Sequence, residues 1–195
     1  MGAILELLER KGVLDDTFIV FLSDNGYFFG EHGLGPERRF AYEEGIRSPF
    51  VIRFPKQVEG GTRRSELVIC QDIAPTILSL AGSAPGAQIQ GRSLLPLFGH
   101  ANSGAHAWRE SILCEYWAEQ AMPWLIGMTY KAIRTERYKY IRWVNRDIAG
   151  ELDELYDLST DPYELENLNG AASMAPVRER LRRELRRLVV EALGL

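Results

Sequence analysis

The chain has 195 residues, of which 46% are hydrophobic and 26% charged, an ordinary composition for a globular protein. Its 23 Lys and Arg residues against 27 Asp and Glu residues give a formal net charge of -4, which argues against nucleic acid or an anionic membrane as a partner. The sequence has no apolar run of about 18 residues and thus no candidate transmembrane helix. The N-terminus, MGAILELLERKG, lacks the pattern of a signal peptide, and the sequence indicates no compartment.

Residues 1–107 read as the C-terminal portion of an α/β domain. Apolar residues at helical spacing predict a helix over Ala3–Lys11 that stops at Gly12. The apolar run Thr17–Leu22 predicts a strand buried on both faces of a sheet, and Pro49–Phe54 predicts a second strand. Because no strand precedes the first helix, we expect an incomplete sheet whose unpaired edges would allow self-association.

Three shorter elements complete this portion. Leu67–Ile69 predicts a short strand, and Ser93–Phe98 predicts one helical turn. Asp72–Leu80 predicts a helix, with Asp72 near its N-cap, Pro75 in its first turn and Gly82 after its end.

Residues 108–195 change character and predict a small antiparallel sheet with a terminal helix. Four stretches rich in aromatic and β-branched residues read as strands: Ser111–Trp117, Met128–Thr135, Tyr138–Trp143 and Glu154–Leu158. Their close succession favours antiparallel pairing. Apolar residues at helical spacing from Val177 to Ala192 predict the terminal helix. The fold class is therefore α/β, or α+β for the chain as a whole.

The two cysteines, Cys70 and Cys114, carry no disulfide or catalytic signal. We expect each to be a small buried hydrophobic residue.

The first candidate site follows the strand that ends at Leu22. Asp24 and Asn25 offer adjacent oxygen ligands of the kind that Ca²⁺ and Mg²⁺ prefer, and Gly26 permits a sharp turn. In open α/β sheets, ligands bind beyond the carboxyl ends of strands. The alternative is a plain turn after a strand, which also uses Asp, Asn and Gly.

The loop that follows carries fixed positive charge. Arg38 and Arg39 suit a tetrahedral oxyanion, because a guanidinium binds such groups through two parallel hydrogen bonds. Beside a divalent cation they would form a sulfate or phosphate site. The alternative is that both arginines pair with the nearby acids Glu37, Glu43 and Glu44.

His32 lies in the same loop. It could donate a proton to a leaving group or contact the anion, and the alternative is a structural role.

Several motifs in order resemble the C-terminal half of the type I sulfatases, within the alkaline phosphatase superfamily. The resemblance covers nearly the whole chain. Its motifs are SDNGYFFGEHGL, RRFAYEEGIRSPFVIRFP, DIAPTILSLAG, GRSLLPLF, KAIRTERYKYI and ELYDLSTDPYELENL.

The resemblance implies roles for four residues. Asp24 and Asn25 would be ligands of the active-site metal, usually Ca²⁺, with Mg²⁺ as the alternative. Arg38 would contact the sulfate of the substrate ester, at a position that is commonly Lys, and Arg39 is the second candidate. The segment from His32 to Tyr42 is one residue longer than the family pattern.

One family feature is absent from these residues. Sulfatases use a formylglycine nucleophile made from the Cys or Ser of a C/S-x-P/A-x-R motif in their N-terminal half, and this chain contains no such motif. We therefore expect a C-terminal fragment of a sulfuric ester hydrolase that carries part of the metal and sulfate site and is inactive alone.

Two other functions stay open. One is a phosphodiesterase or phosphonate hydrolase of the same superfamily, although such enzymes often have His where this chain has Asn25. The other is a non-catalytic remnant that acts as an interaction module.

Overall fold

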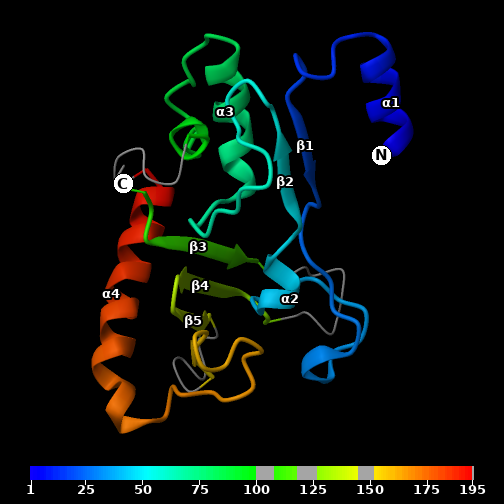
Figure 1. The fold of residues 1–195 in the computed structure, drawn as a ribbon. Helices are drawn as coiled ribbons and strands as arrows, with labels where there is room; N and C mark the ends of the chain where they lie inside the picture. Colours follow the sequence, from blue (N-terminus) through cyan, green and yellow to red (C-terminus); the bar gives the residue numbers. More distant parts are fainter. Residues whose placement is uncertain (100–107, 118–126, 145–151, 195) are drawn as a thin grey trace. The chain divides into compact units, whose positions relative to one another are not determined.

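The computed structural model describes residues 1–99, 108–117, 127–144 and 152–194 (Figure 1). The chain forms two units. The first contains residues 1–24 and 48–108, and the second contains residues 25–47 and 109–195. The predicted division near residue 107 stays a prediction, but the grouping adds residues 25–47, the loop with most of the candidate site, to the second unit.

The first unit combines helices with a two-stranded antiparallel sheet. Its elements are α1 (Gly2–Arg10), β1 (Ile19–Leu22), β2 (Phe50–Arg53), η2 (Cys70–Asp72), α3 (Ile73–Leu80) and η3 (Leu95–Leu97). These agree with the predicted helices and the two longer strands. The predicted strand over residues 67–69 is wrong: this stretch is irregular, and the carbonyl of Leu67 accepts a hydrogen bond from the Trp108 indole at 2.7 Å.

The burial predicted for β1 is wrong in the described residues. β1 pairs only with β2 there, so no strand covers its other edge. Phe21 is 46% exposed and Val51 of β2 is 59% exposed. Helix α1 likewise forms as predicted but buries none of its residues, and Ile4 is 63% exposed.

Asp72 fixes the start of α3. Its carboxylate is fully buried and accepts the backbone N–H groups of Ile69 at 2.9 Å and Arg92 at 2.8 Å. A side chain at Gly91 would place its Cβ 1.9 Å from the carbonyl oxygen of Gln71, so only glycine allows this approach. Asp72 is thus the N-cap residue, as predicted, but its side chain ties together two loops and does not cap the helix.

The second unit is built on a four-stranded antiparallel sheet in the order β3-β4-β5-β6. The predicted strands and their antiparallel pairing are confirmed. The elements are η1 (Glu31–Gly33), α2 (Glu43–Ile46), β3 (Ser111–Tyr116), β4 (Tyr130–Thr135), β5 (Tyr138–Trp143), β6 (Glu154–Asp157), η5 (Ala172–Met174) and α4 (Ala175–Ala192).

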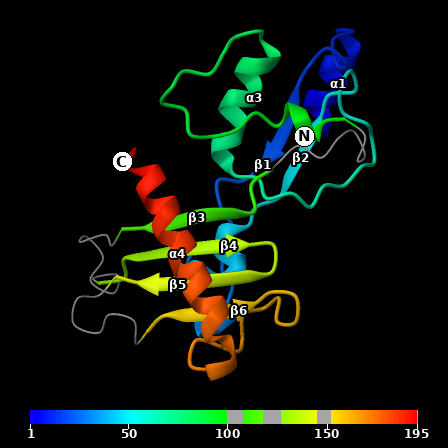
Figure 2. The ribbon, with the colours of Figure 1, turned by 90° about the vertical axis from the view of Figure 1, so that its left-hand side faces the viewer.

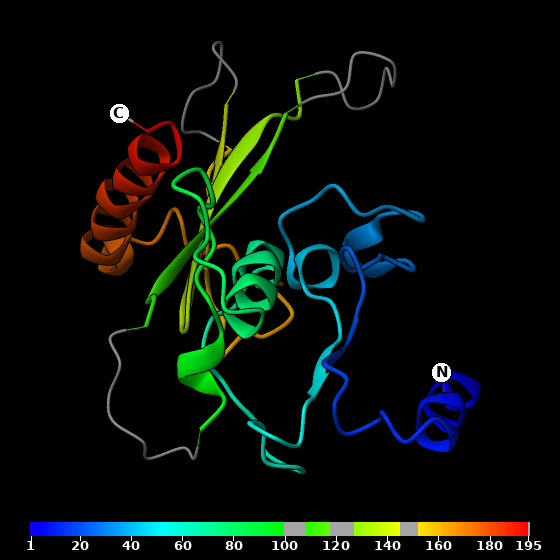
Figure 3. The same cartoon turned by 90° about the horizontal axis from the view of Figure 1, so that it is seen from above.

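Each face of this sheet has its own apolar cluster, because side chains alternate between faces along a strand. Helix α4 crosses one face, where its Leu181 and Leu185 pack on Ile133 and Tyr140 (Figures 2 and 3). The opposite face carries a second cluster that includes Ala41 from the candidate-site loop, together with Tyr130, Ala132, Ile141 and Tyr156. The loop is therefore part of the core of this unit. No helix in the described residues is both long and apolar enough to cross a membrane.

Candidate functional site

The segment 25–47, which we call the site loop, closes on itself. The N–H of Gly26 donates to the carbonyl of Gly45 at 2.9 Å, and the N–H of fully buried Phe28 donates to the carbonyl of Glu37 at 2.8 Å. A Cβ at Gly26 would lie 1.9 Å from the carbonyl oxygen of Glu44. Glycine is required at this position because the two ends of the loop approach so closely.

Arg38 and Arg39 follow a glutamate that binds both of their backbone amides. Oε1 of Glu37 accepts the N–H groups of Arg38 at 2.7 Å and Arg39 at 3.0 Å, and also the Nη1 of Arg39 at 3.0 Å. The Arg39 side chain is consequently 19% exposed, whereas Arg38 is exposed. Of the two, Arg38 is the more exposed residue.

His32 packs within the loop. Its ring stacks on Tyr42 with centroids 4.0 Å apart, and its Nε2 lies 3.3 Å from Oε2 of Glu44. Its side chain is only 11% exposed, and its backbone has a φ of 56°, in the left-handed region. These contacts give His32 a structural place in the loop, and its predicted contact with substrate stays a prediction.

Tyr42 fastens the loop to the sheet. Its hydroxyl donates to Oε2 of Glu154 on β6 at 2.9 Å. The same carboxylate accepts the hydroxyl of Tyr156 at 2.5 Å and the indole N–H of Trp143 at 2.7 Å. Three donors thus converge on one carboxylate, which holds it in place.

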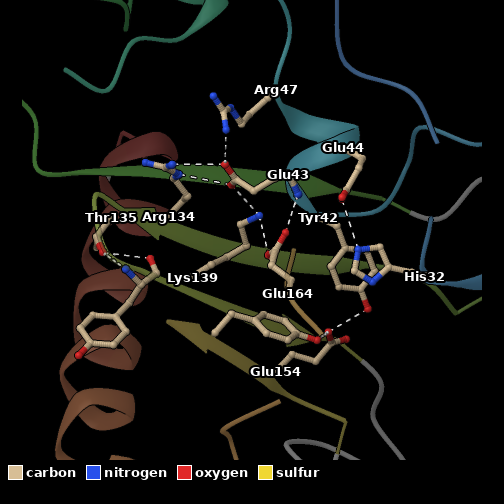
Figure 4. A network of polar contacts seen from close by, with 12 residues as sticks. His32, Tyr42, Glu43, Glu44, Arg47, Arg134, Thr135, Lys139, Glu154 and Glu164 are labelled. Carbon is tan, nitrogen blue, oxygen red and sulfur yellow. Dashed lines mark hydrogen bonds and ion pairs between the residues drawn. The ribbon is translucent and has the colours of Figure 1, made fainter. Parts of the chain in front are cut away.

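Glu43 forms the second attachment of the site loop to the sheet, through a cluster of charged side chains (Figure 4). Its Oε1 lies 2.8 Å from Nζ of Lys139, and its Oε2 lies 3.3 Å from Nη2 of Arg134. Lys139 also pairs with Oε1 of Glu164 at 2.7 Å, and Oε2 of Glu164 accepts the backbone N–H of Glu43 at 2.6 Å. Lys139 and Glu164 both have fully buried side chains, so the contacts within this cluster replace their hydration.

The two glutamates of this cluster differ in their pKa shifts. Burial raises the pKa of Glu43, but Lys139 and Arg134 outweigh it, and the net shift is downward. For Glu164 burial is the largest effect and outweighs Lys139, so its pKa is raised. Glu43 is therefore the more firmly ionised member of the pair.

Asp24 and Asn25 are adjacent in sequence, at the end of the first unit and the start of the second. Both supply hard oxygen atoms, and Asp24 is exposed while Asn25 is half-buried. Ca²⁺ takes six to eight oxygen ligands, and no cluster of three or more His, Cys, Asp or Glu side chains suited to a metal occurs in the described ranges. The donor chemistry of the pair fits a Ca²⁺ site, but two side chains would form only part of it.

Sequence reasoning did not identify the distant partners of the site loop. Arg134, Lys139, Glu154 and Glu164 lie far from the loop in sequence, and their own strands and turns give no local sign of this contact. A weak signal was available in β5, where Lys139 shares its face with Ile141 and so points toward a core.

Comparisons with known proteins identify the family. Residues 30–191 match the family model described as N-sulphoglucosamine sulphohydrolase, C-terminal. The chain is 37% identical over 186 residues to the N-acetylglucosamine-6-O-sulfatase of Bacteroides thetaiotaomicron, covering 93% of this chain and 31% of that protein. It is 31% identical over 190 residues to the N-acetylglucosamine-6-sulfatase of Bos taurus, covering 85% of this chain and 33% of that protein.

Solved structures agree with these matches. The structure of BT4656 in complex with its substrate D-glucosamine-2-N,6-O-disulfate superposes with a TM-score of 0.88 at 36% identity, covering 98% of this chain and 37% of that one. The phosphonate monoester hydrolase of Agrobacterium radiobacter gives a TM-score of 0.82 at 26% identity, covering 98% of this chain and 38% of that one.

Both the predicted fold class and the predicted family are confirmed. The chain spans about a third of the length of the curated relatives that it matches. The family model matches 162 residues of this chain. Together with these relatives, this match shows that the chain belongs to the sulfatase family and corresponds to the C-terminal region of such proteins.

Proposed function

We propose that this chain supplies the C-terminal part of the active site of a sulfuric ester hydrolase. Asp24 and Asn25 would hold the metal ion, Ca²⁺ or alternatively Mg²⁺, and Arg38 would contact the sulfate group, with Arg39 as the second candidate. The observation that carries the proposal is the family match over residues 30–191, which contains most of the site loop with Arg38 and Arg39. Asp24 and Asn25 lie just before the matched residues, and the similarity to the Bacteroides thetaiotaomicron sulfatase covers 93% of the chain. The exposure of Arg38 beside the more enclosed Arg39 favours Arg38 as the anion contact.

The chemistry of ester hydrolysis explains these roles. Cleavage of a sulfate ester breaks the bond between sulfur and the alcohol oxygen, and negative charge shifts among the oxygen atoms. A cation bound at Asp24 and Asn25 would offset negative charge on the sulfuryl oxygens. Arg38 can do so through two N–H donors, and donors already in place when the charge develops stabilise the transition state without reorganisation.

The substrate that we propose is a sulfated sugar, with 6-O-sulfated N-acetylglucosamine as the first to test. The names of the relatives support this choice, since two of them are sulfatases of that sugar.

A chimera tests the proposal. This chain would replace the matching region of the Bacteroides thetaiotaomicron N-acetylglucosamine-6-O-sulfatase. We expect the chimera to hydrolyse the 6-sulfate, and Asp24→Ala to lower kcat/KM at least a hundredfold. The matched control is Asp16→Ala, which removes an exposed carboxylate that pairs with Lys56. A chimera that hydrolyses the ester equally well with Asp24→Ala would contradict the proposed metal site.

The isolated chain gives a second test. Because its 195 residues contain no formylglycine motif, we expect no hydrolysis of p-nitrophenyl sulfate above that of the Asp24→Ala variant. Thermal unfolding with millimolar Ca²⁺ would report the metal site directly, because a ligand that binds only the folded chain raises its Tm.

The structural match to a phosphonate monoester hydrolase supports one alternative function. The same chimera, assayed with a sulfate ester and a phosphonate monoester of the same alcohol, separates the two. We expect the sulfate ester to be preferred, and preference for the phosphonate would favour the alternative.

A further inference from the structure

Two cations stand directly opposite each other in the sheet of the second unit. Arg134 of β4 and Lys139 of β5 are Cα partners in the antiparallel register. Like charges at such positions repel each other, so the arrangement is unfavourable unless an anion lies between them. That anion is Glu43 of the site loop, whose carboxylate contacts both side chains. Arg134 and Lys139 thus form a positively charged binding site on the sheet, which we call the receptor, for the carboxylate of Glu43.

Glu164 completes the receptor. One of its oxygens pairs with Lys139, and the other accepts the backbone N–H of Glu43, so Glu43 is held by both its side chain and its main chain. Glu164 has a φ of 54°, which is uncommon for a residue with a side chain. The local conformation that brings Glu164 into the cluster therefore carries some strain.

We propose that Lys139, together with Glu164, is a positioning residue for the anion-contacting part of the site loop. Lys139 is fully buried and therefore does not itself touch a substrate. It acts through Glu43, which lies five positions after Arg38 in the same closed loop. The inference rests on the proposed function for the role of Arg38, but the placement of the loop can be tested independently.

A similar polar cluster on the opposite face of the same sheet supplies a matched control. Arg182 of α4 donates its Nε to the hydroxyl of Tyr140 at 2.8 Å and its Nη2 to buried Asp153 at 3.1 Å. None of these three residues belongs to the site loop. Arg182→Met should therefore destabilise the unit without releasing the loop, whereas Lys139→Met should do both.

Hydrogen–deuterium exchange of the full chain tests the placement. We expect Lys139→Met to speed amide exchange at least tenfold in residues 26–46 while exchange in β4 and β5 changes much less. Arg182→Met should leave exchange in residues 26–46 within twofold of the unsubstituted chain. Equal protection of residues 26–46 in the Lys139→Met and unsubstituted chains would overturn the inference.

A milder variant covers the case in which Lys139→Met does not fold. Glu164→Gln keeps an oxygen that can accept the N–H of Glu43 but removes the charge that pairs with Lys139. We expect a threefold to tenfold rise in exchange of residues 26–46, and no rise would again overturn the inference.

The chimera adds the functional readout. At a temperature at which all variants are folded, Lys139→Met should lower kcat/KM at least tenfold and Arg182→Met less than twofold. Loss of loop protection without loss of kcat/KM would overturn the link to anion binding. An inactive unsubstituted chimera would count against the proposed function, and the exchange experiment would still decide whether Lys139 positions the loop.

Discussion

Removing the Tyr42 hydroxyl should loosen the attachment of the site loop to the sheet by a measurable amount. In Tyr42→Phe the ring and its stacking partner His32 remain, and the donor to Glu154 is lost. Burial is the main cause that raises the pKa of Tyr42, so the hydroxyl is present as a donor at any pH near neutrality. The substitution therefore removes the hydrogen bond to the carboxylate together with the interaction of this hydroxyl with Tyr156.

Its magnitude follows from the surroundings of Glu154. A hydrogen bond to a charged group contributes about 1.5–3 kcal/mol. The carboxylate keeps its bonds from Tyr156 and Trp143 and is not left unpaired, so we expect the lower end, about 1.5 kcal/mol. For a unit of roughly 110 residues, an unfolding entropy of about 2.1 cal/mol/K per residue converts this into a Tm lower by about 6 °C.

Scanning calorimetry of a double-mutant cycle measures this coupling. The cycle contains Tyr42→Phe, Glu154→Gln and the double variant, and we expect a coupling of about 1 kcal/mol or more between the two positions. Tyr163→Phe is the control, since Tyr163 is 67% exposed and should leave the Tm within about 1 °C. The reasoning is refuted if the Tm of Tyr42→Phe matches that of the control or if the two substitutions are additive.

Three further predictions concern pH, packing and thiol reactivity. Hydrogen bonds from an exposed arginine lower the pKa of Asp157 from its ordinary 3.8 to about 2, so its contribution is complete above pH 4 and is lost as the pH falls through 2. After allowance for solvent screening we expect about 1 kcal/mol, measured by urea unfolding from pH 5 to pH 2, and Asp157→Asn should flatten the curve. Gly26→Ala should cost about 3 kcal/mol or more in urea unfolding because its Cβ meets a backbone oxygen of α2, whereas Gly35→Ala, with open space around it, should be neutral. A disulfide reagent at pH 8 should modify Cys70, which is exposed, far faster than Cys114, because burial raises the pKa of the Cys114 thiol to about 11; equal rates would contradict this.

The second unit was largely predictable because its signals are local. In β5, the side chains of Tyr138 and Tyr140 lie on the face of the sheet that α4 covers, and Ile141 lies in the cluster on the opposite face. Successive side chains of a strand alternate between faces in this way. The turn between β4 and β5 is too short for any connection but a hairpin. Both features can be read from a few neighbouring residues.

Burial in the first unit was not predictable in the same way. The apolar run at β1 correctly indicated a strand, but burial depends on which elements cover its faces and edges. In the described residues its single partner is β2, and Phe21 stays exposed. The prediction for Cys70 failed for the same reason, since this residue is exposed, whereas Cys114 packs against a core cluster as expected.

The partners of the loop glutamates show a different limit. Proximity in sequence suggested that Glu37, Glu43 and Glu44 would neutralise Arg38 and Arg39, and Glu37 does bind Arg39. For Glu43 the shortest ion pair is with Lys139, and its backbone is held by Glu164, 121 positions further along the chain. Such a pairing follows only from the register of β4 with β5 and from the fold of the turn after β6, which no local pattern encodes.

These contacts give a structural reason for several of the sulfatase motif residues in a chain whose sequence contains no nucleophile motif. Within the site loop, three motif residues have structural roles. Gly26 allows a close backbone approach, and Tyr42 and Glu43 attach the loop to the sheet. Of the residues to which we assign the chemistry, Asp24 and Arg38 are exposed and Asn25 is half-buried. Motif residues of this kind therefore indicate a loop that is packed on its sheet. Hydrolysis requires in addition a nucleophile that these residues do not contain. The chimera separates the two requirements, because it supplies the nucleophile and leaves the loop and its attachments to this chain.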